Sequence, residues 1–282
     1  MFQRLGRIGD YDPVRQVGNP CSSASIAALK HAYAAQQWQL GYAECSAVSL
    51  SFDKYQQLQQ ALHTEVTAAW QKGSTQEALL LQRDQLAFSL CWGAAVRAEN
   101  AGALQLKEVQ DRRGQPLGPL LLQPAFPFPE GFQWQLAPDG TKVARRRRAG
   151  VVPMTVLPPA EAYRDALRLL HQYIQACPTC HLSTSGYLLH AQTPDGQGFK
   201  QEPWSTSSLN KRLQHHLHRL GLFAGESSHG LRRGTAIHDH QQLGSTPAAI
   251  GDRLLHADPG GVQTKRYLDT SRETERPVRQ RR

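Results

Sequence analysis

The sequence predicts a mainly α-helical protein with one small antiparallel β-sheet, an α+β fold. Apolar residues recur at helical spacing over most of the chain, and two short apolar stretches flank a turn near its middle. Glycine or proline separates these segments. At 282 residues the chain is long enough for one large domain and a small appendage.

The N-terminal part of the chain differs from the rest. Residues 1–20 contain five Gly or Pro residues and no apolar period, which predicts an irregular lead-in. A short helix is expected at about 23–40. We therefore divide the chain into a short N-terminal segment, 1–48, and a main domain, 49–282.

Helices are expected over most of the main domain. Ser51 offers an N-cap for the first, and its apolar positions recur at helical spacing. These positions are Tyr55, Leu58, Leu62 and Val66. A second and more apolar helix follows at 75–96. The remaining helices are expected at about 162–174, 206–220, 231–243 and 246–256, the last one behind Ser245.

Two strands are expected between these helices. Gly131–Leu136 and Gly150–Val156 are short apolar stretches on either side of a turn at Asp139–Gly140. A run of four arginines, Arg145–Arg148, lies between them. The pattern predicts a hairpin that carries a basic loop.

The composition favours an anionic partner. Lys and Arg outnumber Asp and Glu by 32 to 23, which gives a net charge of +9 and suits nucleic acid. No stretch approaches the roughly 20 apolar residues of a membrane span, and the N-terminus lacks a signal peptide's apolar core. We expect no membrane partner and an intracellular protein, cytoplasmic or nuclear depending on the host. Five cysteines without an export signal predict reduced thiols.

One set of residues carries the chemistry, and its order is informative. His229-Gly-Leu-Arg232 is followed by His256 and then by Tyr267, while Arg97 stands much earlier, after the apolar helix. This order resembles the catalytic domain of the tyrosine recombinase (phage integrase) family, over roughly 49–282. The segment after Arg97 resembles the family's first arginine box, with Leu104 and Glu108 at the expected offsets. Where the family usually has an acidic residue this chain has Asn100, and Glu99 lies one place earlier.

The resemblance implies a fold and a set of roles. The family's catalytic domain is mainly helical with a small three-stranded sheet, and a helical DNA-clamping domain precedes it, of which residues 1–48 would be a remnant. Tyr267 would attack a DNA phosphate and form a phosphotyrosyl bond. Arg97 and Arg232 would bind the phosphate oxygens, since guanidinium groups form paired hydrogen bonds with phosphate. His229 and His256 would donate to the phosphate or manage the phenol proton.

The departing DNA oxygen needs a proton, which the family takes from a lysine on a strand turn. Lys142 is the only lysine in the predicted hairpin. One of Arg145 to Arg148 could occupy that place instead, although a pKa above about 12 makes arginine a poor acid. No metal or other cofactor is expected, because the phosphotyrosyl ester keeps the energy of the broken bond.

Duplex DNA is the expected partner, with a tetrameric synapse implied by the family and recombination of a mobile element as the expected role. The residues expected to contact DNA are Arg145, Arg146, Arg147, Arg148, Arg233 and Lys265. A nuclear-import signal is an alternative interpretation of the arginine run, and the run fits it less well than a DNA-facing turn. The short N-terminal segment leaves open a degenerate fragment that binds DNA without recombining it. A type IB topoisomerase and a non-catalytic basic scaffold are further alternatives.

Two other patterns invite a metal or haem interpretation. Cys177-Pro-Thr-Cys180-His181 matches the string that attaches c-type haem, yet that chemistry belongs to exported proteins, and a second cysteine pair for zinc is missing. We interpret it as a loop with free thiols. Histidines cluster at 215–218 and at 238–240, and we interpret both clusters as surface or DNA-facing positions.

Overall fold

A computed structural model describes most of the chain. The continuous stretches are 48–138, 150–177, 186–193 and 198–254. Single residues or pairs are described at 11, 12, 15, 17–19, 23, 25, 26, 28, 29, 32, 195, 264, 265, 268 and 269. The chain divides into two compact units, residues 1–46 and 47–282, and each is described by itself.

The first unit is described at few positions. The Asp12 backbone N–H donates to the Val17 carbonyl at 3.0 Å, and the two residues form an antiparallel bridge. The helix predicted at about 23–40 lies largely outside the described residues. Whether residues 1–48 are a remnant of a DNA-clamping domain therefore stays a prediction.

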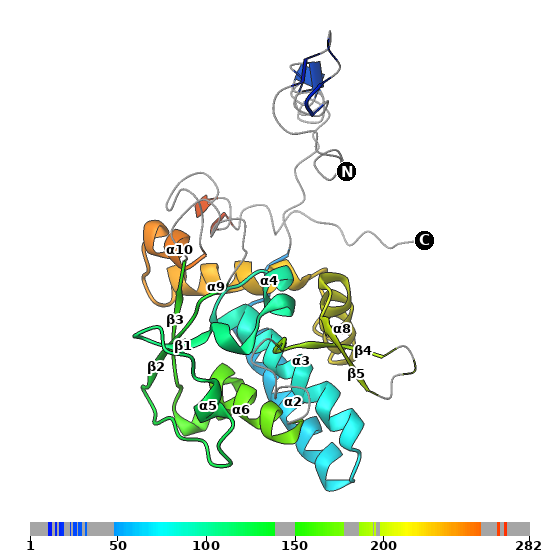
Figure 1. The fold of residues 1–282 in the computed structure, drawn as a ribbon, viewed down its shortest axis with the longest axis vertical. Helices are drawn as coiled ribbons and strands as arrows, with labels where there is room; N and C mark the ends of the chain where they lie inside the picture. The colour runs from blue at the N-terminus through cyan, green and yellow to red at the C-terminus, as the bar shows by residue number, and fades with distance from the viewer. Residues whose placement is uncertain are drawn as a thin grey trace. The chain divides into compact units, whose positions relative to one another are not determined.

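The second unit is built around one central helix, α3 (Thr75–Gly93), which contacts α2 (Phe52–Gln71) and the later helices (Figure 1). Apolar residues lie on nearly every side of α3, and a helix of that kind is stable only when other elements cover it. Among the described residues, the other helices of this unit include α4 (Ala98–Ala103), α5 (Gly118–Leu121), α6 (Ala166–Ala176), α8 (Thr206–Arg219), α9 (Ser228–Gln241) and α10 (Pro247–Arg253). Two 3-10 helices, η3 (Leu106–Glu108) and η4 (Pro159–Arg164), join them. The prediction of a mainly helical fold is confirmed.

The first two helices follow the sequence pattern closely. Ser51 caps α2, and its side chain accepts a hydrogen bond from the Lys54 N–H at 3.3 Å. All four predicted apolar positions of α2 are buried. Helix α3 ends at Gly93 rather than at 96, because the chain turns at Ala95, whose φ of 49° is incompatible with a right-handed helix.

Three short strands form an antiparallel sheet in the order β1-β2-β3. They are β1 (Val109–Asp111), β2 (Gln133–Leu136) and β3 (Val152–Thr155), and Trp134 of β2 pairs with Met154 of β3. The two predicted strands are confirmed in shortened form. The expectation of a single sheet was wrong, because β4 (His190–Gln192) and β5 (Phe199–Pro203) form a second hairpin. Strand β5 is mostly polar and exposed, so it lacks the apolar pattern of a strand.

Helix α8 begins at Thr206, as predicted, whereas the three other later helices begin at different residues from those predicted. Helix α6 starts at Ala166 rather than at 162, because Asp165 caps it by accepting from the Arg168 N–H at 2.8 Å. Helix α9 starts at Ser228 and so includes His229 in its first turn. Thr246, not Ser245, caps α10 by accepting from the Ala249 N–H at 3.2 Å.

A buried ionic cluster joins α3 to α8. The Asp84 carboxylate, fully buried, is 2.6 Å from Nε of Arg212 and 2.9 Å from Nε2 of His216, and Arg83 lies beside it. Burial raises the pKa of Asp84, but the His216 hydrogen bond and the two guanidinium charges outweigh it, so the net pKa lies below its usual value. The interpretation of His216 as a surface residue was wrong, because it is 1% exposed.

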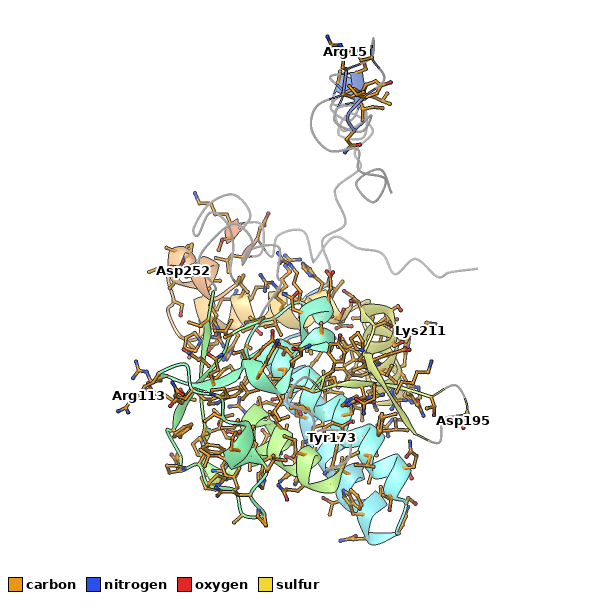
Figure 2. All side chains as sticks on the ribbon, in the orientation of Figure 1. Arg15, Arg113, Tyr173, Asp195, Lys211 and Asp252 are labelled. Atoms are coloured by element: carbon orange, nitrogen blue, oxygen red, sulfur yellow. The ribbon has the colours of Figure 1, made fainter. Side chains whose placement is uncertain are left out.

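Side chains fill the space between the elements of this unit (Figure 2). Tyr173 of α6 is fully buried, whereas Arg113 and Asp252 lie at the periphery. Within the described residues, no helix has both the length and the apolar character needed to cross a membrane.

Candidate phosphate-binding site

The site is built at the N-terminal end of α9, where the backbone of residues 48–50 crosses the helix closely. A Cβ on Gly230 would lie 2.3 Å from the Val48 carbonyl oxygen, and one on Gly234 would lie 1.9 Å from that of Leu50. The Leu50 N–H donates to the Gly230 carbonyl at 3.0 Å. Glycine is therefore needed at both positions, one helical turn apart, to seat α9 in this place.

Arg232 lies between these two glycines and points into the protein. Its side chain is 3% exposed, and its guanidinium donates hydrogen bonds to the carbonyls of Ala95 and Leu254. Ala95 follows the end of α3 and Leu254 follows α10, so one side chain joins three elements. A guanidinium stays charged at any physiological pH, so Arg232 also brings a fixed positive charge to this junction.

Arg97 reaches the same junction from the turn after α3. It is the N-cap residue of α4 and is partly exposed, and its guanidinium makes no hydrogen bond to another described residue. Ala95, two residues earlier, is the one non-glycine residue with positive φ in the described part of the chain. Such a conformation costs on the order of 1 kcal/mol and commonly occurs at functional sites. The turn that presents Arg97 is thus held in place by its surroundings, including the bond from Arg232.

Arg97 and Arg232 both lie near enough to His229 for their charges to act on its pKa. Loss of hydration lowers the pKa of His229, and the charges of Arg232, Arg97 and Arg233 lower it further, in that order. This shift favours the neutral imidazole in the free protein. It lies on the first turn of α9, where the helix dipole also favours an anion. The partly exposed Arg97, the His229 imidazole and the buried charge of Arg232 together favour an anion at this end of α9.

A small apolar cluster lies beside these charges. It consists of Ala95, Ala236 of α9, and Ile250 and Leu254 of α10, and Leu268 packs against it. Leu268 immediately follows Tyr267 in the sequence. The polypeptide on the C-terminal side of the predicted nucleophile therefore lies against the elements that hold Arg97 and Arg232.

No known protein-family profile and no curated protein matches this sequence. Among solved structures, the XerH site-specific recombinase bound to its difH substrate is similar, with 13% identity, a TM-score of 0.49, and coverage of 80% of this chain and 52% of that one. A lambda integrase dimer bound to a COC' core site has 12% identity and a TM-score of 0.43, covering 85% of this chain and 53% of that one. The XerA recombinase has 15% identity and a TM-score of 0.46, covering 85% and 66%.

These solved structures are all tyrosine recombinases, the family that the sequence motifs resemble. With TM-scores below 0.5, the similarities carry no argument about the activity of this chain. The chain spans about half the length of the XerH and lambda integrase chains that it matches.

Several predicted site residues lie outside the described residues. They are Tyr267, His256, Lys142, Arg145, Arg146, Arg147 and Arg148. Lys265, expected to contact DNA, is exposed, whereas Arg233 is 2% exposed. The structure thus brings together Arg97, His229 and Arg232, and the roles of the other predicted residues stay predictions.

Sequence reasoning missed the residues that support the site from behind. Arg253 of α10 donates hydrogen bonds to the Asp239 carboxylate on α9 and, at 2.5 Å, to the Gly93 carbonyl at the end of α3. Burial raises the pKa of Asp239, and the charge of Arg253 opposes that shift. This pair fixes α10 against α9 and α3. Its members are far apart in the sequence and belong to no motif, so only the fold identifies them.

The described residues offer no cluster of three or more His, Cys, Asp or Glu side chains arranged to hold a metal ion. Cys177 is buried, and Cys180 lies outside the described residues.

Proposed function

We propose that this chain cleaves and rejoins duplex DNA through a covalent bond between Tyr267 and a DNA 3′-phosphate, as a site-specific recombinase. The observation that carries the proposal is the convergence of Arg97, His229 and Arg232 at the N-terminal end of α9. The packing of Leu268 beside them supports a role for the residue before it.

The chemistry of phosphate transfer accounts for these residue types. Attack of an oxygen on a phosphodiester places extra negative charge on the non-bridging oxygens, and catalysis consists largely of positioning and of stabilising that charge. Arg97 has a guanidinium free of described partners, and Arg232 supplies a second fixed charge from the protein interior. The His229 imidazole can donate a ring N–H to a phosphate oxygen.

The proposed step balances without a cofactor. The phenolic oxygen of Tyr267 forms a bond to phosphorus, the bond from phosphorus to the 5′-oxygen breaks, and the phenol proton passes to a histidine or to solvent. Lys142 gives a proton to the departing 5′-oxygen. One phosphodiester is exchanged for another, so rejoining by the reverse step needs no ATP.

The net charge of +9 supports duplex DNA as the partner. We place the reaction within a tetrameric synapse that recombines a mobile element, because the sequence resembles a family that works in this way. The XerH structure is of a recombinase bound to its DNA substrate, and the lambda integrase structure is of a dimer bound to a core site.

A nicked suicide substrate tests the proposal directly. Cleavage next to the nick releases a short oligonucleotide by diffusion and traps the covalent adduct, which is detected as a shift in a denaturing gel. Tyr267→Phe is expected to bind the same DNA and form no adduct, because only the hydroxyl oxygen is removed. An adduct formed by the Phe variant at the normal rate would show that another residue is the nucleophile.

Relaxation and strand-exchange assays on the same plasmid distinguish a recombinase from a type IB topoisomerase and from a fragment that only binds DNA. A type IB topoisomerase would relax supercoils without a partner site, whereas a recombinase exchanges strands only between two target sites. A degenerate fragment would bind the DNA and give neither product.

A further inference from the structure

Arg233 was expected to contact DNA, yet it is buried and bonded within the protein. Its side chain is 2% exposed, and its guanidinium donates a hydrogen bond to the backbone carbonyl of Asp269. Arg233 lies on α9, next to Arg232, while Asp269 lies two residues after Tyr267 in the sequence. One side chain thus connects the helix of the phosphate site to the segment of the predicted nucleophile.

The same segment has three further features. Within it, the Asp269 N–H donates to the Lys265 carbonyl at 3.0 Å. Thr264, at the start of the segment, is fully buried. Leu268 packs on the apolar cluster of Ala95, Ala236, Ile250 and Leu254. The segment therefore has a polar anchor at Arg233 and an apolar anchor at Leu268.

The cost of leaving a buried arginine without its acceptor explains why this contact stabilises the docked segment. A guanidinium keeps its charge when buried and carries five N–H donors, and each donor that loses its acceptor is costly. If the segment left α9, Arg233 would lose the Asp269 carbonyl in a place that water reaches poorly. Arg233 therefore favours the docked state of the segment more strongly than an exposed residue would.

We propose that Arg233 is a positioning residue that docks the segment 264–269 of the same chain against the phosphate site, and that it does not contact DNA directly. The proposal rests on the proposed role of Tyr267 and goes beyond it. Docking within one chain would present the nucleophile of each molecule to the arginines of that same molecule. A displacement of about 1 Å is enough to slow a positioned reaction by about 10²-fold, so the anchor controls the rate.

The first measurement is independent of catalysis. Amide hydrogen exchange in the segment 264–269 is compared between the wild-type chain and Arg233→Met, which keeps a long side chain but removes all donors. We expect exchange in this segment to become at least about tenfold faster while exchange in α3 stays unchanged, because a local opening exposes only local amides. Unchanged exchange in 264–269 would overturn the proposal, whatever the activity of the chain.

The second measurement separates positioning from DNA contact. Arg233→Met is expected to lower the single-turnover rate of adduct formation by about 10²-fold and to leave DNA affinity within about threefold of wild type. Arg233→Lys, which retains one charge and an ammonium donor, should recover part of the rate. Arg113→Met is the matched control, since it removes the same charge at an exposed turn. Equal losses of affinity and rate in Arg233→Met would indicate a direct DNA contact and reject the positioning role.

Leu268→Ala covers the case in which Arg233→Met fails to fold. This change removes the apolar anchor without altering any charge, and we expect faster exchange in 264–269 and slower adduct formation at constant DNA affinity. Wild-type rates of both processes in Leu268→Ala would count against docking. If Tyr267→Phe still forms the adduct, the proposed function fails, while the exchange experiment continues to test docking by itself.

Discussion

The two arginines of the site differ in what they do for the folded protein. Arg232 is buried and donates to two backbone carbonyls, so it is part of the structure before any DNA binds. Arg97 is partly exposed and makes no hydrogen bond to another described residue. A phosphate arriving at the site would therefore complete the hydrogen bonding of Arg97, whereas Arg232 acts mainly through its charge and through the geometry that it maintains.

This difference predicts different consequences for Arg97→Ala and Arg232→Ala. Both should slow adduct formation by about 10²–10³-fold, the scale for loss of one donor to a developing anion. Only Arg232→Ala should also lower the free energy of unfolding, by about 1–3 kcal/mol or more, because it leaves the Ala95 and Leu254 carbonyls without a donor. Urea unfolding of both variants, beside single-turnover kinetics, checks the contrast. Near-normal cleavage by Arg97→Ala would remove that residue from the phosphate clamp.

His229 provides a test of the site by titration. Its pKa in the free protein should lie below the ordinary imidazole value of about 6.5, owing to lost hydration and to the three arginine charges. DNA binding should raise this pKa, because a phosphate offsets those charges. Nuclear magnetic resonance titration of labelled histidine, with His229→Gln to assign the signal, measures both values. A pKa that DNA leaves unchanged would place the phosphate elsewhere.

The same shift fixes the sign of a stability effect. Because the folded pKa of His229 is lowered, the unfolded chain binds more protons between the two pKa values, so stability rises with pH across that window. On acidification through the ordinary imidazole value the wild-type chain should lose stability relative to His229→Gln. Chemical unfolding of both proteins across this pH range measures the difference.

At the scale of elements, the seating of α9 depends on two glycines. Helix propensity alone predicts that Ala in place of Gly stabilises a helix by about 1 kcal/mol. The structure predicts the opposite, because a Cβ at Gly230 or Gly234 would lie 2.3 or 1.9 Å from a backbone oxygen of residues 48–50. Gly230→Ala and Gly234→Ala should each lower the free energy of unfolding by about 1–3 kcal/mol, the usual cost of overpacking.

Gly198→Ala is the control for this pair. A Cβ there meets only the Thr193 side chain at 3.8 Å, an ordinary contact, so stability should change by no more than about 0.5 kcal/mol. Denaturant midpoints of the three variants give the comparison. If Gly234→Ala proves as stable as the wild-type chain, the close crossing of 48–50 over α9 is incorrect.

Helices with a strong apolar period were predictable, and their ends were less so. The period of α2 and the capping role of Ser51 follow from side-chain chemistry that acts within one turn. The start of α6 depends on Asp165, whose carboxylate also accepts a hydrogen bond from the Leu157 N–H at 2.5 Å, a contact between separate elements. Helix α3 ends where tertiary packing imposes a positive φ on Ala95. Hairpin β4–β5 carries no apolar alternation, so nothing local marked it.

In the candidate site, too, residues that belong to a local motif were predictable, whereas properties that depend on distant partners were not. Arg97, His229 and Arg232 were predicted because phosphate chemistry restricts the residue types and their order, and their roles stay predictions. Burial was not predictable for charged residues: His216 is held inside by Asp84, and Arg233 by its bond to the Asp269 carbonyl. Both look like surface residues until the partner, more than thirty positions away, is known. Sequence patterns therefore identify the chemistry better than they identify the residues that hold it in place.

At the scale of the whole molecule, the excess of positive charge should determine how the chain meets DNA. The net charge of +9 is spread over a chain in which several arginines are buried, among them Arg83, Arg232 and Arg233. Arg83 and Arg233 are expected to release few counterions from DNA, because their guanidinium groups are bonded within the protein. Exposed residues such as Lys265 are the ones expected to neutralise phosphates.

Salt dependence of DNA affinity separates these two groups. A plot of log affinity against log salt concentration should fall with a slope of about −0.9 for each phosphate neutralised on duplex DNA. Lys265→Ala should make the slope shallower by about one and weaken binding to all sequences alike, as expected for a phosphate contact. Arg233→Met should leave the slope unchanged, since its guanidinium is bonded inside the protein. A flat salt response of the wild-type chain would contradict the nucleic-acid partner, and a slope altered equally by both substitutions would place Arg233 on the DNA.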